Sequence, residues 1–164
     1  MRASSLFAAL SAAAASNAMT FSIMAAEEQT VDYAWEVTGW SAGCSRRGCY
    51  YNFNITAEAN TTSYPQRPAF SAYCHGYGEG APYELCQLLM EPEVPLGVEA
   101  KLLPADRSPN ETTKANIQVS VQHIDLESPT TYWNYTAKAQ ARYNQFVAPL
   151  MNFTMRPHEV FGVA

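Results

Sequence analysis

Charged side chains are scarce in this sequence. Asp, Glu, Lys and Arg make up only 15% of the 164 residues, against roughly 25% in typical globular proteins, and this scarcity excludes a disordered acidic tail or a coiled coil. Acidic residues outnumber basic ones by 15 to 10, which gives a formal net charge of -5. Because nucleic-acid binding requires a basic surface that releases counterions from phosphates, we expect no nucleic-acid partner.

Long hydrophobic runs are absent after the N-terminus. No later stretch approaches the about 18 apolar residues of a transmembrane helix, so the sequence predicts no membrane span. At the N-terminus, Arg2 precedes an apolar, Ala-rich stretch that ends in the small residues Ser16 and Ala18. This pattern is typical of a secretory signal peptide rather than of a buried Ala-rich helix. We therefore predict a signal peptide over residues 1–18, with cleavage as late as residue 26 as an alternative, and one secreted domain over 27–164.

Two further features predict secretion. The four cysteines are an even number, as expected of a disulfide framework formed outside the reducing cytosol. Five of the nine Asn residues begin an Asn-x-Thr sequon, where chance predicts about one. Because N-glycosylation requires the secretory route, we predict an extracellular glycoprotein. The candidate acceptors are Asn54, Asn60, Asn110, Asn134 and Asn152.

Apolar and polar residues alternate along most of the chain after residue 32. Period-2 alternation is typical of half-buried strands. The positions expected to face the core are Tyr33, Trp35 and Val37; Tyr51, Phe53 and Ile55; Phe70, Ala72 and Cys74; Leu96, Val98, Ala100 and Leu102; Ile117, Val119 and Val121; and Trp133, Tyr135, Ala137 and Ala139. Asn54, Ser120, Asn134 and Thr136 fall on the outward faces, and further strands are expected over 152–155 and 160–163.

The segments between these strands are polar and rich in Pro or Gly, notably 60–68, 75–82 and 104–113. Short strands at regular spacing predict an all-β fold, either an antiparallel β-barrel or a sandwich, in a single domain stabilised by disulfides. Residues 136–147 could also suit a helix, but the alternation from Trp133 to Ala141 favours a strand.

The cysteines allow three pairings, and the residues themselves do not decide among them. Local pairing would join Cys44 to Cys49 around a Ser-Arg-Arg-Gly loop and Cys74 to Cys86 around a Gly-rich loop. The crossed alternatives would tie the first hairpin to the third strand. Because Cys-x4-Cys with Cys-x11-Cys is poor zinc spacing, we predict no metal site, and no motif indicates a cofactor.

Two consecutive strand segments carry a resemblance to a known family. Asp32–Trp40 begins Asp-Tyr-Ala-Trp, and Tyr50–Ile55 reads Tyr-Tyr-Asn-Phe-Asn-Ile. Together they resemble the opening of the Alternaria major-allergen family, which are small secreted fungal proteins with a β-barrel fold. The family's Phe-x-x-x-Cys strand is similar to Phe70–Cys74, and this resemblance implies a Cys74–Cys86 disulfide.

The chain also departs from that family. It has no Cys between the predicted signal peptide and Cys44 to join two subunits, so we expect a monomer, and it has no second disulfide near the C-terminus. The resemblance implies a divergent member among fungal effectors and elicitors. It implies as partners a host extracellular protein, such as a thaumatin-like plant defence protein, or a small phenolic ligand.

An enzymatic site is the less favoured interpretation. A small ribonuclease would need two acid/base groups and a cation for the phosphate, and the best combination is His75 with Glu84 and either Arg46 or Arg142. His75 is more simply a loop residue, His123 a satisfied residue at a strand end, and His158 an exposed residue near the terminus. Because no nucleophile elbow, metalloprotease helix or phosphate loop occurs, we predict no catalytic residue.

Aromatic and cationic loop residues suggest a binding surface instead. Tyr64, Tyr73, Tyr77 and Tyr83 surround the Pro- and Gly-rich loops, and Tyr is enriched at interfaces, although ordinary core and rim positions are the alternative. Two Arg side chains in the Cys44–Cys49 loop could contact an acidic partner or a membrane surface, or could be solvated loop charge. The predicted binding residues are Arg46, Arg47, Tyr64, Tyr77 and Tyr83.

We therefore expect a non-enzymatic secreted effector or elicitor that acts on plant defence components. The alternative is a carrier that holds a small apolar phenolic or flavonoid ligand inside the barrel. A small secreted ribonuclease or hydrolase is the third possibility.

Overall fold

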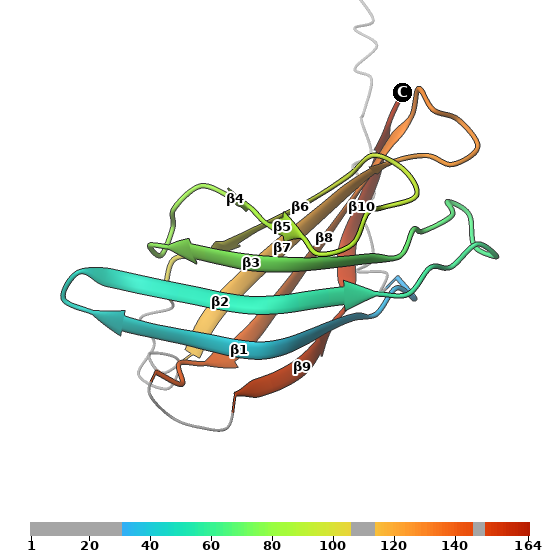
Figure 1. Ribbon diagram of the computed structural model, residues 1–164. Helices are drawn as coiled ribbons and strands as arrows, with labels where there is room; N and C mark the ends of the chain where they lie inside the picture. The colour runs from blue at the N-terminus through green and yellow to red at the C-terminus, as the bar shows by residue number, and fades with distance from the viewer. Residues whose placement is uncertain (1–30, 106–113, 146–149) are drawn as a thin grey trace, which may run out of the picture.

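The computed structural model describes residues 31–105, 114–145 and 150–164, and every element in these ranges is a β-strand (Figure 1). The predicted signal peptide and the sequon at Asn110 lie outside the described residues. The predicted all-β fold is confirmed. The strands are β1 (Trp35–Ser45), β2 (Gly48–Ala57), β3 (Phe70–Tyr77), β4 (Glu84–Leu85), β5 (Gln87–Leu88), β6 (Leu96–Leu102), β7 (Lys114–Ile124), β8 (Tyr132–Arg142), β9 (Met151–Met155) and β10 (Pro157–Val163).

These strands form an antiparallel sandwich of two five-stranded sheets. The first sheet has the order β5-β3-β2-β1-β9 and the second has the order β10-β8-β7-β6-β4. In Figure 1, β1, β2 and β3 run across the front while β6, β7 and β8 cross behind them. Of the two predicted architectures, the structure therefore has the sandwich.

The chain passes from one sheet to the other at both lateral edges. Cys86 alone separates β4 from β5, and Arg156 alone separates β9 from β10, although the members of each pair belong to different sheets. Strands that switch sheets in this way form the corners of a sandwich. Two such corners give the fold some of the closure of a barrel. The strand pattern in the sequence is compatible with both a barrel and a sandwich.

The interior is filled by the side chains that the alternation placed inward. Trp35, Phe53, Phe70 and Tyr135 are each at most 1% exposed, and aliphatic residues of the second sheet pack against them. Burying a large apolar side chain stabilises a fold by roughly 1.5–3 kcal/mol. The cross-sheet hydrogen bond from the Tyr51 hydroxyl to the Ala100 carbonyl, at 2.7 Å, satisfies one of the buried polar groups.

A bulge in β1 adds a core residue that simple alternation misses. Gly39 has a φ of 66°, a left-handed conformation that glycine adopts without strain. The register shifts there, between Thr38 and Ser41 toward β2 and between Val37 and Trp40 toward β9. As a result Val37 and Trp40 both point inward and are 1% and 0% exposed, as expected when a bulge redirects a side chain.

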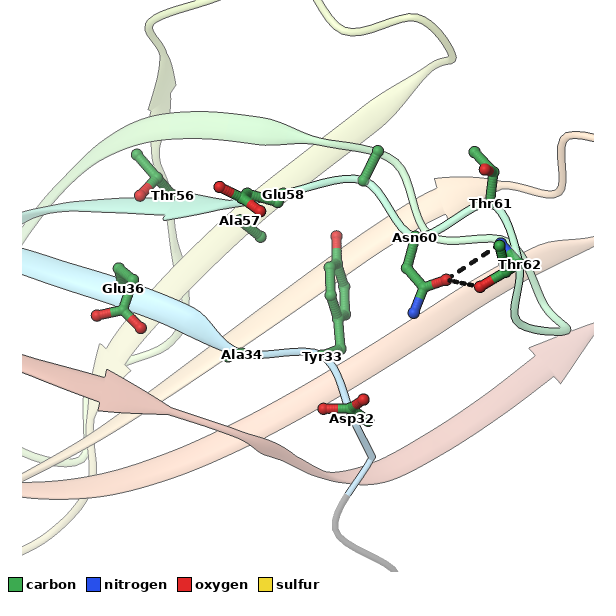
Figure 2. A pocket seen from close by; sticks show the side chains of 11 residues that line it. Asp32, Tyr33, Ala34, Glu36, Thr56, Ala57, Glu58, Asn60, Thr61 and Thr62 are labelled. Atoms are coloured by element: carbon green, nitrogen blue, oxygen red, sulfur yellow. Dashed lines mark hydrogen bonds between the residues drawn. The ribbon is translucent and has the colours of Figure 1, made fainter.

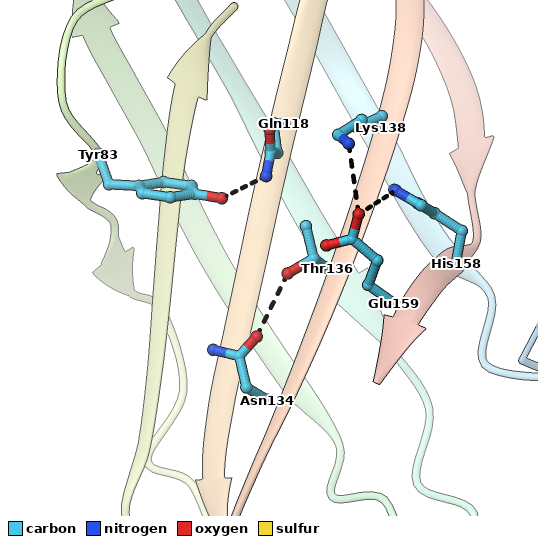
Figure 3. A network of polar contacts seen from close by, with 7 residues as sticks. All are labelled: Tyr83, Gln118, Asn134, Thr136, Lys138, His158 and Glu159. Atoms are coloured by element: carbon cyan, nitrogen blue, oxygen red, sulfur yellow. Dashed lines mark hydrogen bonds and ion pairs between the residues drawn. The ribbon is translucent and has the colours of Figure 1, made fainter. Parts of the chain in front are cut away.

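The outer face of the second sheet carries a polar network (Figure 3). Ser120 and Thr136, which were expected in solvent, are 3% and 6% exposed. Both bond to Asn134: its Nδ2 donates to the Ser120 hydroxyl at 3.0 Å, and its Oδ1 accepts from Thr136 at 3.2 Å. The predicted face is therefore correct, but both side chains are buried on it rather than exposed to solvent.

Candidate binding surface

The structure contains the local disulfide pairing. Cys44–Cys49 joins β1 to β2 next to their turn, and Cys74–Cys86 joins β3 to the β4–β5 corner. The second disulfide is buried, whereas Cys44 is exposed. The first disulfide therefore closes the tip of a hairpin on which Arg46 and Arg47 are both exposed.

Aromatic side chains continue from this hairpin tip along the outer face of β2 and β3. The register places Tyr50 opposite Tyr77, Asn52 opposite His75 and Asn54 opposite Tyr73. Tyr77 is 75% exposed, and the Gly78 amide donates to the Cys49 carbonyl at 2.8 Å, which holds the end of β3 against the tip. An open depression of about 270 Å³ lies here and is lined by Tyr50, Tyr51, Asn52, Tyr73, His75 and Tyr77.

We call Arg46, Arg47, Tyr50 and Tyr77 the clip-end surface. It combines two cations with two phenol rings on a hairpin tip that a disulfide and the neighbouring strand hold in place. A positioned loop on a rigid sheet is a common setting for binding residues. Tyr and Arg are also among the side chains that are enriched at protein interfaces.

The other two predicted binding tyrosines lie elsewhere. Tyr73 and Tyr77 do line one depression, so the expected cluster of four tyrosines is wrong for Tyr64 and Tyr83. Tyr64 packs edge-on against Trp133, with ring centroids 6.2 Å apart. It follows the end of β2 at Ala57, and at about 3.3 Å per residue that end lies about 23 Å along the strand from Tyr50. Tyr83 lies on the second sheet, where Lys101 Nζ is 4.1 Å from its ring centroid and Gln118 donates to its hydroxyl (Figure 3). Burial raises the pKa of Tyr83. Proximity in sequence misled here because strand β3 separates the two loops.

A larger depression of about 670 Å³ lies at the opposite end of β1 and β2 (Figure 2). Its polar groups are largely engaged within the protein. The Thr154 hydroxyl donates to Glu36, Arg156 pairs with Asp32 at 3.3 Å, and Asn60 Oδ1 accepts from Thr62 and Ser63. The clip-end surface is therefore the better candidate for binding a partner.

The residues of the considered ribonuclease site are dispersed. His75, which was interpreted as a loop residue, instead lies in β3 on the outer face of the first sheet, with its ring 5.6 Å from that of Tyr73. Glu84 pairs with Ala100 in the second sheet, Arg46 is on the hairpin tip and Arg142 is at the end of β8. Within the described ranges, no ion pair or hydrogen bond joins any two of these four side chains.

The other two histidines are both largely covered. His123 is 1% exposed, as its inward position predicted, but only its Nδ1 is satisfied, 2.9 Å from the Ile124 carbonyl oxygen. His158 was expected to be exposed, and this was wrong: its side chain is 16% exposed and lies 3.4 Å from the Glu159 carboxylate. Its position in β10, rather than in a free C-terminal tail, explains the difference.

One convergence of possible metal ligands has an ordinary explanation. The sulfur atoms of Cys44 and Cys49 and a carboxylate oxygen of Glu79 lie within 4.8 Å of one another. Both sulfurs belong to a disulfide and cannot bind a metal as thiolates. Glu79 instead accepts a hydrogen bond from the Tyr143 hydroxyl. The pKa of Tyr143 is raised mainly by burial and further by this carboxylate.

Arg67 is a buried residue that the sequence did not reveal. It is 9% exposed in the β2–β3 loop, donates to the Asp32 carbonyl, and places its guanidinium 5.7 Å from the Tyr33 ring centroid. Burial is the main cause that raises the pKa of Tyr33, and the nearby Arg67 charge opposes it. A loop position between Gln66 and Pro68 carries no local signal of such burial.

Comparisons of the chain with protein-family models, with curated proteins and with solved structures find no match. The resemblance to the Alternaria major-allergen family therefore stays a prediction. No helix within 31–105, 114–145 and 150–164 could cross a bilayer.

Proposed function

We propose that this protein is a secreted, non-enzymatic effector or elicitor that binds a host extracellular protein through the clip-end surface. The observation that carries the proposal is the exposed pair Arg46 and Arg47 beside the 75% exposed Tyr77 on a disulfide-closed hairpin. Two disulfides in a small β domain fit an oxidising, extracellular compartment, and four of the five sequons lie within the described residues.

The chemistry of this surface favours a protein partner with exposed carboxylates. Guanidinium groups form bidentate hydrogen bonds with carboxylates, and a Tyr ring adds apolar area with a polar tip. Because the chain itself is acidic, with a formal net charge of -5, the two arginines form a local positive feature that orients an approaching acidic surface. A thaumatin-like plant defence protein is the candidate partner that the family resemblance suggests.

A carrier with its ligand between the sheets receives no comparable support. The space there is filled by side chains that are almost fully buried, including Trp35, Trp40 and Phe53. The two depressions described above lie on the outer face and at one end of the first sheet.

The test is infiltration of the purified mature protein into leaves, followed by affinity capture from leaf extracellular fluid. We expect a cell-death or defence response, or its suppression, and a captured protein whose affinity falls about tenfold in the Arg46→Glu/Arg47→Glu variant, equivalent to about 1.4 kcal/mol. Arg156→Glu is the matched control, because Arg156 is an exposed cation at the other end of the first sheet. Absence of any leaf response, or equal loss of binding in both variants, would refute the proposal.

A further inference from the structure

Two of the sequon asparagines lie within strands, directly opposite an aromatic residue. Asn54 in β2 pairs with Tyr73 in β3, and Asn134 in β8 pairs with Phe161 in β10. Residues directly opposite in an antiparallel pair share a face, and their Cβ atoms are about 4.5–5.5 Å apart. The same arrangement therefore occurs once on each sheet, in segments unrelated in sequence.

Both pairs lie on outer faces of the sandwich. The neighbours of Asn54 in β2, Phe53 and Ile55, point inward, as does Tyr135 next to Asn134. Phe161 is 54% exposed, so about half of its surface is open to solvent. A large apolar ring in solvent beside a glycosylation acceptor is explained if a sugar covers it.

The acceptor amides are compatible with this role. Among the described residues, Asn54 Nδ2 makes no hydrogen bond, and even a Cβ added to Gly39 would lie 3.8 Å from it, an ordinary van der Waals distance. Asn134 Nδ2 donates one proton to Ser120. An amide has two such protons, so a glycosylated Asn134 keeps one for that bond.

We propose that Asn54 and Asn134 carry N-linked glycans whose first N-acetylglucosamine packs on Tyr73 and Phe161, respectively. The sugar is transferred from a lipid diphosphate donor: the amide Nδ2 bonds to the anomeric carbon and loses one proton, and the diphosphate leaves with the electrons of the broken C–O bond. The ring of each aromatic then contacts the C–H face of the pyranose, while the hydroxyls remain in water. This proposal shares with the proposed function only the secretory route.

The other two described sequons serve as internal controls. Asn60 lies in a loop and pairs with Arg67. Asn152 lies in β9 beside the bulge, where its Oδ1 accepts from the Gly39 amide at 3.0 Å. Since neither has an aromatic register partner, a glycan on Asn60 or Asn152 is expected to extend into solvent without a packing surface.

The test is a coupling experiment on protein secreted from a eukaryotic host. Glycopeptide mass spectrometry measures occupancy at each sequon, and an endoglycosidase then trims the glycans to the first sugar. Thr56→Ala removes the Asn54 sequon by changing an exposed residue, so it provides the background without that sugar. Tyr73→Ser is expected to lower the melting temperature by about 2–4 °C more when the Asn54 sugar is present than in the Thr56→Ala background. Phe161→Ser is compared in the same way with and without Asn134→Gln.

Tyr77→Ser is the control, because Tyr77 is an exposed aromatic whose register partner is Tyr50 rather than a sequon. Its effect on the melting temperature should be the same with and without sugars. A second measurement does not depend on stability: the N-acetyl methyl signals of the two sugars should be shifted upfield by the rings and should lose that shift in Tyr73→Ser and Phe161→Ser. Unoccupied Asn54 and Asn134, or occupied sites with neither coupling nor a ring-current shift, would overturn the proposal whatever the leaf assay shows.

Discussion

The imidazole of His123 stacks on the phenol ring of Tyr135, with ring centroids 5.6 Å apart and planes 11° from parallel. His123 Nδ1 donates to the Ile124 carbonyl, while Nε2 has no partner among the described residues. The nearby charged groups are Asp125, which follows Ile124, and Arg67, which acts on Tyr135. Burial lowers the pKa of His123, and the Ile124 carbonyl and Asp125 offset this only in part.

This lowered pKa predicts acid sensitivity. Because the folded state holds His123 neutral, the unfolded chain binds a proton first as the pH falls below about 6.5. The stability from neutral His123 is therefore complete above about pH 6.5 and is lost as the pH falls toward the folded-state pKa, by at most about 1.4 kcal/mol per pH unit. Urea unfolding at pH 7.5 and pH 5.0 measures the difference.

His123→Phe is the matched variant for this prediction, because Phe keeps a flat ring against Tyr135 and cannot titrate. We expect its unfolding free energy to change less between the two pH values than that of the natural chain. An equal pH dependence in both proteins would show that other groups are responsible. Asp125 titrates in a separate, lower range, since the Trp133 indole N–H holds the pKa of its carboxyl below the usual value.

The two disulfides should differ in their contribution to stability. Replacing Cys74 and Cys86 by Ala should lower the free energy of unfolding by about 3 kcal/mol, and replacing Cys44 and Cys49 by about 2 kcal/mol. The reason is that Cys74–Cys86 closes the longer loop. The buried pair also loses packing, whereas the hairpin ends are already held by strand register. Chemical denaturation of the two double variants checks the order, and a larger loss for Cys44→Ala/Cys49→Ala would contradict it.

The sequence predicted the faces of the strands because alternation is a local property of an extended chain. Phe53, Ala72 and Val119 point inward as expected, since each lies within an uninterrupted period-2 segment. Trp40 could not be placed in this way, because the bulge at Gly39 depends on pairing with two neighbouring strands. The choice of a sandwich also depends on distant pairing, through the corners at Cys86 and Arg156.

The candidate site was predictable only where its residues are close in sequence. Arg46 and Arg47 lie inside the loop that the local disulfide closes, so their exposure on a hairpin tip follows from the pattern. Tyr77 joins them through its register with Tyr50, and Tyr64 is excluded by the length of the strand between them. Neither relationship has a signal in the local sequence.

Gly76 is predicted to be irreplaceable for lack of space. A Cβ on Gly76 would lie 2.6 Å from the Tyr51 hydroxyl oxygen, and that hydroxyl is fixed by its bond to Ala100. Gly76→Ala should therefore destabilise the fold by about 1–3 kcal/mol through overpacking. Gly97→Ala is the control, because a Cβ there meets nothing within 4 Å, and it should be neutral or slightly stabilising. Similar melting temperatures for the two variants would count against this account.

Asn144 completes the edge of β1 beyond its last pairing with β9. The last pair joins Trp40 to Met151. Beyond it, the side chain of Asn144 accepts a hydrogen bond from the Ala42 amide at 2.9 Å and donates one to the Trp40 carbonyl at 2.7 Å. All three residues are buried. The side chain of Asn144 thus replaces a strand as the hydrogen-bonding partner of β1.

Asn144→Ala should therefore cost about 2–4 kcal/mol, because it leaves two buried backbone groups without partners. Asn116→Ala is the matched control on the outward side of β7, where the side chain makes no hydrogen bond among the described residues, and it should change stability by less than about 0.5 kcal/mol. Amide hydrogen exchange supplies a second readout: the Ala42 amide should exchange faster in Asn144→Ala and unchanged in Asn116→Ala. Protection of Ala42 that survives the loss of Asn144 would show that another group satisfies this edge.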